Sequence, residues 1–295
     1  MSDIKNANRS FAIIGGDMRQ IRLANSLAKN GYTVRVFGFN ADNKHLHIKP
    51  SSSLDEAIEG ASIIVLPLPS LSQSNIINTP LYDENIYICS LLEKMTKNQI
   101  LLGGKIDDSL KTLLNIHNVY YIDYFLREEL IVLNAALTAE GGISIALSNT
   151  PFALFSSKCL VIGYGRIGKI LCNMLDGLGA NVCACARKHE AFAWIDSYGY
   201  DKCHIDKLKE VIGDYNIIFN TAPSLVITKD VLKNVRSDAL IVDLASKPGG
   251  VDFESARELG INTIWALSLP GRSAPISAGD IIKCTILNIC DELGV

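Results

Sequence analysis

The sequence predicts an α/β protein with two Rossmann-like, doubly wound parallel-sheet domains, separated by a cleft and linked by a long interdomain helix. Short apolar runs alternate with segments of helical period along the whole chain, which is typical of βαβ units. Glycines follow the first apolar run of each half. The length of 295 residues suits two domains, and the 48% hydrophobic content is enough for two cores.

The first half is predicted to alternate strands and helices up to residue 150. The strands are Phe11–Ile14, Thr33–Phe37, Ser62–Leu66, Ile100–Leu102 and Val119–Ile122, with helices at Met18–Lys29 and Leu110–Asn115. A long helix over residues 126–147 should be interrupted at Gly141-Gly142, and Asn149-Thr150-Pro151 should end it. We therefore expect the first domain to cover residues 1–150.

The second half repeats this alternation over residues 151–279. Its strands are predicted at Lys158–Ile162, Asn181–Ala186, Asn216–Phe219, Leu240–Val242 and Asn262–Trp265, and its helices begin near Arg166, Glu190, Asp206 and Asp252. A Pro/Gly loop should follow over Ser268–Gly279, before an amphipathic helix over Asp280–Leu293. We expect this C-terminal helix, residues 280–295, to pack back on the first domain.

Composition excludes several classes of function. A net charge of −3 gives no general attraction to nucleic acid or to an anionic membrane. The longest apolar stretch, Ala61–Leu71, contains two prolines and is shorter than the ~20 residues of a membrane span. The first ten residues lack the apolar core of a signal peptide, so we expect a cytoplasmic protein. The eight cysteines form no C-x-x-C pair and are interpreted as reduced core thiols, and no metal site is expected.

The most specific motif is a glycine loop between the strand at Lys158–Ile162 and a helix. Gly163 permits a tight turn, Gly165 lets a pyrophosphate approach the backbone, and Gly168 lets helix and strand pack closely. The helix N-terminus then offers free N–H groups to the phosphates. The segment Gly163-Tyr164-Gly165-Arg166-Ile167-Gly168 therefore predicts a dinucleotide site.

The end of the next strand indicates which dinucleotide is bound. NAD enzymes normally place Asp or Glu there to bind the ribose hydroxyls. Here Arg187 and Lys188 follow Ala186, and no carboxylate is present. An arginine suits a 2′-phosphate in charge and in bidentate geometry, so NADP is favoured, with NAD still possible.

Two more segments follow strands of the second half. Open parallel sheets bind ligands at the carboxyl ends of their strands. We therefore expect Asn220-Thr221-Ala222-Pro223, and Asp243 with Ala245 in the next loop, to border the nicotinamide ribose. A helix-capping role for Asn220 remains the alternative.

The first half offers a site for an anion. Gly15-Gly16-Asp17 begins a helix without the third glycine, and Arg19 could reach a carboxylate. Pro67-Leu68-Pro69-Ser70 and Gly103-Gly104-Lys105 follow neighbouring strands, so all three segments should lie on one sheet edge. This predicts a substrate pocket facing the nucleotide cleft. The alternative places Arg19 on a solvated helix face.

Taken together, these segments resemble the family of NADP-binding subunits of dipicolinate synthase, found in spore-forming bacteria. The resemblance runs from Phe11 to the final helix. Besides the segments above, it rests on Asn134-Ala135, Thr138-Ala139-Glu140-Gly141, Asp243-Leu244-Ala245-Ser246-Lys247-Pro248-Gly249-Gly250, Leu269-Pro270-Gly271-Arg272, Ala274-Pro275 and Ala278-Gly279. Leu137 and Gly142 stand where the family usually has proline and alanine, so the interdomain helix is expected to bend differently.

The resemblance implies an NADP-dependent oxidoreductase. Such proteins work with the second, flavoprotein-like subunit of dipicolinate synthase to oxidise a dihydrodipicolinate-type intermediate to dipicolinate in the sporulating mother cell. A dicarboxylate substrate needs cations, for which Arg19, Lys105 and Arg272 are the candidates and Arg127 is a weaker fourth. Glu140 and Lys105 are the candidate catalytic groups, with helix capping as the alternative for Glu140. We also expect a homo-oligomer.

Two other functions stay open at this point. An alanine- or hydroxyacid-type dehydrogenase would have the same architecture. A hydroxyacid dehydrogenase should place a catalytic histidine near the last strand, and Trp265-Ala266-Leu267-Ser268-Leu269-Pro270 contains none. The second alternative is a nucleotide-binding subunit whose partner performs the chemistry.

Overall fold

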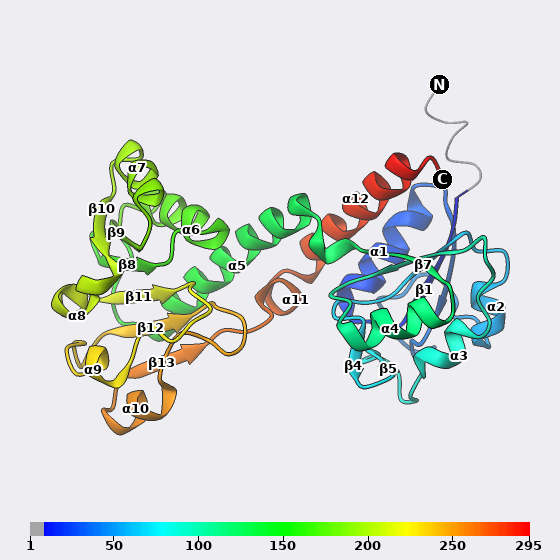
Figure 1. Cartoon of the computed structure of the whole chain (residues 1–295), viewed down its shortest axis with the longest axis horizontal. Coiled ribbons are helices and arrows are strands. Elements are labelled where there is room, and N and C mark those ends of the chain that lie inside the picture. The colour runs from blue at the N-terminus through cyan, green and yellow to red at the C-terminus, as the bar shows by residue number, and fades with distance from the viewer. Residues whose placement is uncertain (1–8) are drawn as a thin grey trace. The chain divides into compact units, whose positions relative to one another are not determined.

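The computed structural model describes residues 9–295 and divides the chain into two compact units (Figure 1). Unit 1 contains the described residues up to Ile131 together with Ala274–Val295, and unit 2 is Val132–Ser273. The N-terminal residues 1–8, on which the expectation about a signal peptide depends, lie outside the described part. The division falls at residue 131 and not at residue 150, so most of the long linking helix belongs to unit 2.

Unit 1 is a parallel sheet with helices on both faces. The strand order is β2-β1-β3-β6-β7. These strands are β1 (Ser10–Ile14), β2 (Thr33–Phe37), β3 (Ile63–Val65), β6 (Ile100–Gly103) and β7 (Tyr120–Asp123). Alternation along β1 sends Phe11 and Ile13 into one core and Ala12 and Ile14 into the other. The first core is covered by α1 (Met18–Lys29) and α12 (Pro275–Leu293), and the second by α2 (Leu54–Ile58), α3 (Ile88–Leu92) and α4 (Asp108–Ile116).

Unit 2 has the six-stranded order β10-β9-β8-β11-β12-β13. In chain order this is 3-2-1-4-5-6, the order of dinucleotide-binding Rossmann domains. The strands are β8 (Lys158–Ile162), β9 (Asn181–Ala186), β10 (Asp201–His204), β11 (Ile217–Asn220), β12 (Leu240–Asp243) and β13 (Asn262–Trp265). The helices are α5 (Glu128–Asn149), α6 (Arg166–Gly177), α7 (His189–Ser197), α8 (Leu208–Val211), α9 (Lys229–Leu232), α10 (Phe253–Glu258) and α11 (Leu269–Ser273). The prediction of two doubly wound parallel sheets is confirmed.

The predicted interruption of the linking helix is wrong, because α5 continues through Gly141 and Gly142. A helical glycine costs only ~1 kcal/mol relative to alanine. Here the missing side chains permit close packing: an added Cβ would lie 3.1 Å from Leu269 at Gly141 and 3.0 Å from Leu244 at Gly142. The glycine pair therefore marks close packing on α11 and on the loop after β12.

The predicted loop over Ser268–Gly279 is also wrong. Residues 269–273 form α11, and α12 begins at Pro275, five positions before the predicted start. Proline is favoured in the first turn of a helix, since its missing N–H would have no helical partner there. Gly279 then lets α12 pack on α1, because an added Cβ would lie 2.7 Å from the Arg19 carbonyl oxygen. An ion pair of 2.7 Å between Arg22 and Asp280 joins the same two helices.

Several short elements escaped the sequence prediction. They are α2, α3, α9, β10 and the two-stranded antiparallel sheet of β4 (Leu71–Gln73) and β5 (Ile76–Ile77). Strand β10 has the sequence Asp-Lys-Cys-His, in which only Cys203 is buried. It pairs with β9 on one side at the edge of the sheet, so it carries little apolar signal.

The interpretation of the cysteines as core thiols holds for most of them. Six are buried, Cys89 is half-buried and Cys284 is exposed, and all are free thiols. Burial raises the pKa of Cys183 and of Cys290 to about 11, so both stay protonated at pH 8. We expect Ellman's reagent at pH 8 to label Cys284 rapidly, Cys89 slowly and the others only after denaturation. Loss of the rapid phase in Cys284→Ser would support this account, and rapid labelling of more than two thiols in the native protein would contradict it.

Candidate functional site

The predicted dinucleotide residues lie along the carboxyl edge of the unit 2 sheet. Ile162 pairs in register with Cys185 on one side and with Asn220 on the other, and Asn220 pairs with Asp243. The segments that follow β9, β8, β11 and β12 therefore stand next to one another at this edge. This is where parallel sheets bind their ligands.

The three glycines of the loop have three different surroundings. Gly163 has φ +95°, and an added Cβ would lie 2.4 Å from the Thr221 hydroxyl oxygen. At Gly168 an added Cβ would lie 2.0 Å from the Gly163 carbonyl oxygen. At Gly165 it would meet no atom within 4 Å. The loop is thus closely packed at both ends and open in the middle, as a pyrophosphate cradle requires.

Helix α6 begins at this opening without a side-chain cap. Gly165 is its N-cap residue and contributes no side-chain hydrogen bond to the first turn. The free N–H groups of that turn, with the partial positive charge of the helix end, suit an anionic ligand. These residues fit the diphosphate of a dinucleotide. Tyr164 faces the core instead, where burial raises its pKa to about 12, so only its backbone is available at the loop.

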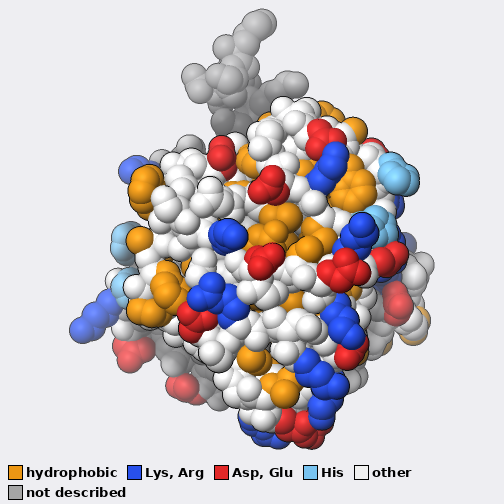
Figure 2. Space-filling model, turned by 90° about the vertical axis from the view of Figure 1, so that its left-hand side faces the viewer, with side chains coloured by type: hydrophobic (Ala, Val, Ile, Leu, Met, Phe, Trp, Pro, Cys, Tyr) orange, Lys and Arg blue, Asp and Glu red, His pale blue; other side chains and the backbone are white. Residues whose placement is uncertain are grey.

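Arg187 and Lys188 occupy the position that selects between NAD and NADP. They follow β9 directly, both side chains are exposed, and Lys188 is the N-cap residue of α7. Figure 2 shows the end of the molecule formed by unit 2, where basic and acidic side chains are interspersed. No broad basic patch covers the part of the surface seen in that view. Selectivity for a phosphate would therefore depend on individual side chains such as Arg187.

Asn220 and Asp243 form a buried network beneath the edge. Both are fully buried, and Asn220 Nδ2 donates to Asp243 Oδ1 at 2.7 Å. The Asp243 carboxylate also accepts the N–H groups of Ala245 at 3.0 Å and Gly250 at 2.8 Å. Asn220 bonds both backbone groups of Ala222, which is a local turn and not a helix cap. These two side chains hold the loops that follow β11 and β12, and the exposed group of the first loop is Pro223.

Replacing Asp243 by asparagine should destabilise unit 2. The new amide keeps the size of the side chain but presents donors where three donors need acceptors. We expect the free energy of unfolding to fall by about 2 to 3 kcal/mol, the cost of buried polar groups that lose charged partners. Urea unfolding measures this loss. Asp201→Asn, at an exposed residue of β10, is the control and should change little, and equal stability of both variants would contradict the role given to the network.

Unit 1 confirms the expected common edge of its three turns. The segments after β1, β3 and β6 follow adjacent parallel strands. Ser70 N–H donates to the Gly104 carbonyl at 2.8 Å, and Gly104 N–H donates to the Pro67 carbonyl at 3.2 Å. The turns after β3 and β6 are therefore fixed to each other.

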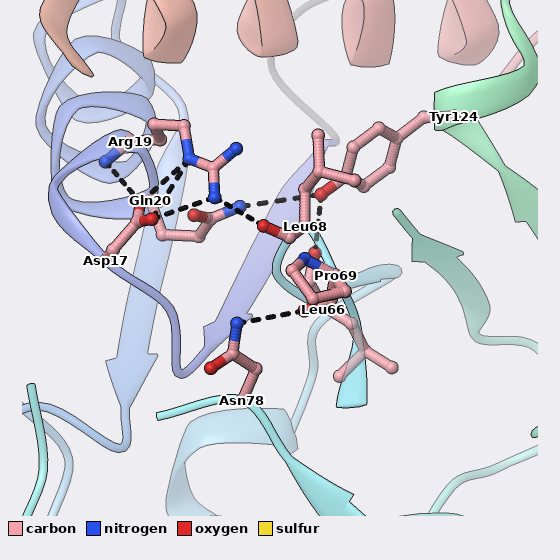
Figure 3. Close-up of polar contacts among 8 residues, drawn as sticks. All are labelled: Asp17, Arg19, Gln20, Leu66, Leu68, Pro69, Asn78 and Tyr124. Atoms are coloured by element: carbon pink, nitrogen blue, oxygen red, sulfur yellow. Dashed lines mark hydrogen bonds and ion pairs between the residues drawn. The ribbon is translucent and has the colours of Figure 1, made fainter. Parts of the chain in front are cut away.

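Arg19 lies at this edge in a network that the sequence did not reveal (Figure 3). Its guanidinium donates to both Asp17 carboxylate oxygens at 2.8–3.1 Å and to the Leu68 carbonyl. The side chain is only 12% exposed, so the alternative of a solvated helix face is wrong. Asp17 also caps α1 by accepting the Arg19 N–H at 2.9 Å. Arg19 is thus held in place by Asp17, and Nη1 makes no hydrogen bond within the described chain.

Two further side chains complete this network. Tyr124 donates its hydroxyl to the Leu66 carbonyl at 3.0 Å, and Gln20 Nε2 donates to the Tyr124 oxygen at 3.5 Å. Both side chains are fully buried. Neither could be predicted, since Tyr124 is more than a hundred positions away from Gln20 in the sequence.

The other predicted site residues are distributed over both units. Lys105 is exposed after β6, has φ +57°, and donates its N–H to Asp123 at 2.9 Å. Arg272 is exposed on α11 in unit 2. Glu140 is exposed in the middle of α5, so it does not cap that helix. Arg127 is paired with Glu129 and Glu292, and the hydrogen bond from Glu292 is the main reason that its pKa is raised.

Comparison with known proteins agrees with these features. Residues 10–125 match the model of the N-terminal domain of DpaA, a subunit of dipicolinate synthase. Residues 136–247 match the NAD-binding domain of D-isomer-specific 2-hydroxyacid dehydrogenases. The corresponding dipicolinate synthase subunit of Bacillus subtilis is 29% identical over 285 residues, which is 96% of each chain.

Solved structures of DpaA proteins are similar over nearly the whole chain. The protein from Bacillus halodurans gives a TM-score of 0.88 with 28% identity and covers 96% of this chain and 98% of its own. The protein from Bacillus subtilis gives the same TM-score and identity and covers 97% of both chains. Fold and glycine loop together define a nicotinamide-dinucleotide-binding protein of the dehydrogenase type. The chain belongs to the DpaA family of dipicolinate synthase subunits.

Proposed function

We propose that this chain is the NADP-binding subunit of a dipicolinate synthase. It would oxidise a dihydrodipicolinate-type dicarboxylate to dipicolinate in the cytoplasm of the sporulating mother cell, together with the second, flavoprotein-like subunit of the enzyme. The observation that carries the choice of cofactor is the open cradle at Gly165 beside the exposed Arg187 and Lys188, without a carboxylate at the end of β9. The similarity to the dipicolinate synthase subunits of two Bacillus species supports the choice of substrate.

The residues at the two sheet edges suggest how the work is divided. Unit 2 would hold NADP, which accepts a hydride at its nicotinamide ring when bound. Gly165 and the start of α6 would bind the diphosphate, and Arg187 would bind the 2′-phosphate. In unit 1, Arg19 Nη1 and the exposed Lys105 would bind substrate carboxylates, and we keep Arg272 as a third candidate cation.

Oxidation to the aromatic ring removes one hydride and one proton from the substrate. Neither predicted catalytic group suits the role of proton acceptor. A lysine ammonium has no lone pair, so Lys105 is better suited to a carboxylate. Glu140 lines a groove with Met174 and Gly177 of α6, whereas the cradle is at Gly165. At about 1.5 Å per residue these two ends of α6 are separated by more than ~12 Å. We therefore propose that the proton leaves to water.

Reconstitution tests this proposal. The purified chain, by itself and with the second subunit of the synthase, is mixed with freshly generated substrate and NADP, and the absorbances of dipicolinate and reduced nicotinamide are followed. We expect both to rise together in equal amounts. Product formation only when both proteins are present would indicate that they share the reaction. Dipicolinate without nicotinamide reduction would assign this chain a non-catalytic, nucleotide-binding role, and failure of both signals in every combination would overturn the proposal.

A further inference from the structure

Helix α5 is more apolar than its own chain requires. Its most apolar window of 18 residues has a mean hydropathy of 1.7, and by length and composition alone it could cross a membrane. Only 39% of that window is buried. One side packs into the unit 2 core through Ala139, Ile143 and Ala146. A helix that is apolar on all sides is normally covered on all sides, so the remaining face indicates a partner.

The uncovered face forms a groove with the neighbouring helix α6 (Figure 1). The residues that line it are Glu140, Ile143, Ser144, Leu147, Ser148, Met174, Gly177 and Leu178. Leu147 is 53% exposed and Leu178 is 47% exposed. Phe155, near the same end of α6, is 73% exposed and packs on Gly179, where an added Cβ would lie 2.7 Å from its ring. These are large apolar side chains held in fixed positions at the surface.

A single row of polar side chains crosses this apolar face. Glu140, Ser144 and Ser148 are four residues apart, so they form one ridge along α5, and all three are exposed. Glu140 is the only charged residue among those that line the groove. A lipid environment would leave this carboxylate unsatisfied, which argues against a membrane as the partner.

The ridge is complementary to itself when two copies are antiparallel. In a two-fold arrangement each residue meets the one equally far from the axis on the other side. An axis at Glu140 would place two carboxylates together, and Gly142 and Ala146 are buried. An axis at Ser144 brings two small side chains together and sets Glu140 opposite Ser148 of the partner subunit. The carboxylate then gains a hydroxyl donor, and Leu147 gains an apolar surface.

We propose that the α5–α6 groove is a dimer interface that binds a second copy of this chain, with the two α5 helices antiparallel and Ser144 on the two-fold axis. The apolar rim at Leu147, Leu178 and Phe155 supplies the hydrophobic contact, and the ridge of Glu140, Ser144 and Ser148 sets the register. This assignment is independent of the reaction and of the cofactor.

Cysteine cross-linking tests the register directly. In a Cys284→Ser background, which removes the exposed native thiol, Ser144→Cys should be captured as a dimer by a short bis-maleimide. Glu140→Cys and Ser148→Cys should each fail alone, because each residue and its own copy would be separated by roughly 12 Å along the helices. An equal mixture of these two variants should give the cross-linked dimer. Capture of Glu140→Cys alone, or of no variant, would overturn the proposed interface.

Sedimentation tests the interface without cross-linking. We expect the wild-type chain to be a dimer at micromolar concentration. Leu147→Glu should raise the dimer dissociation constant by roughly a hundredfold or more, as for a central apolar contact. Leu259→Glu, at another exposed leucine of unit 2, is the matched control and should remain dimeric with the same melting temperature. A wild-type chain that is monomeric, that binds to phospholipid vesicles through this face, or that stays dimeric as Leu147→Glu would contradict the proposal.

Discussion

Replacement of Gly168 by alanine is expected to abolish dinucleotide binding and to lower the stability of unit 2. The added methyl group would lie 2.0 Å from the Gly163 carbonyl oxygen. This obstacle is backbone and cannot rotate away, so the loop or the start of α6 must shift. We expect the affinity for NADP to fall by more than about a hundredfold, since the cradle loses its shape. Calorimetric titration and thermal unfolding measure the two effects.

Two other glycines of the same segment serve as controls for this prediction. At Gly165 an added Cβ meets no protein atom and φ is −85°, so Gly165→Ala should fold normally and yet bind NADP poorly, because the methyl group occupies the space of the diphosphate. At Gly177 an added Cβ is also free of contacts, and the residue lies at the far end of α6. Gly177→Ala should keep both stability and binding. Normal NADP binding by Gly168→Ala or by Gly165→Ala would show that the loop is not the diphosphate site.

An Arg187→Asp variant is expected to lose most of its affinity for NADP and to retain its affinity for NAD. One charge-assisted contact to the 2′-phosphate is worth about 1.5 to 3 kcal/mol, which corresponds to a loss of roughly tenfold to 150-fold. The new carboxylate would also repel the phosphate. It would, however, be placed where NAD enzymes bind the ribose hydroxyls. Separate titrations with NADP and NAD measure the difference.

The control for this second prediction is Lys97→Asp, which makes the same change in charge at an exposed residue of unit 1. It should leave both affinities unchanged. If Arg187→Asp weakens binding of the two cofactors equally, the arginine does not read the 2′-phosphate. Retained NADP affinity in this variant would exclude the role altogether.

Elements with strong local signals could be predicted from the sequence to the residue. Helix α1 has the predicted bounds Met18–Lys29, and strands β8 and β9 also have theirs. Asp17 caps α1, and β8 and β9 are apolar, almost entirely buried runs. Where tertiary contacts decide, the prediction was wrong. The Gly141-Gly142 pair looks like a break in the sequence, but packing on Leu244 and Leu269 keeps α5 continuous.

The same distinction applies to the site. The three roles of Gly163, Gly165 and Gly168 follow from their spacing, and the structure gives each the expected surroundings. The bond between Asn220 and Asp243 joins residues 23 positions apart. It depends on β11 and β12 being neighbours in register, which no local pattern encodes. Asp17 and Arg19 are two residues apart, but the burial of Arg19 depends on the Leu68 carbonyl, 49 positions away.

The most direct test of a role in NADP-dependent oxidation is a comparison of NADP and NAD binding by the wild-type chain. Isothermal titration calorimetry gives both dissociation constants for the same protein preparation, with neither substrate nor the second subunit present. The exposed Arg187 and Lys188 beside the open cradle predict that NADP binds with one-to-one stoichiometry and at least about tenfold more tightly than NAD. Equal affinities, tighter binding of NAD, or no binding of either dinucleotide would contradict this account.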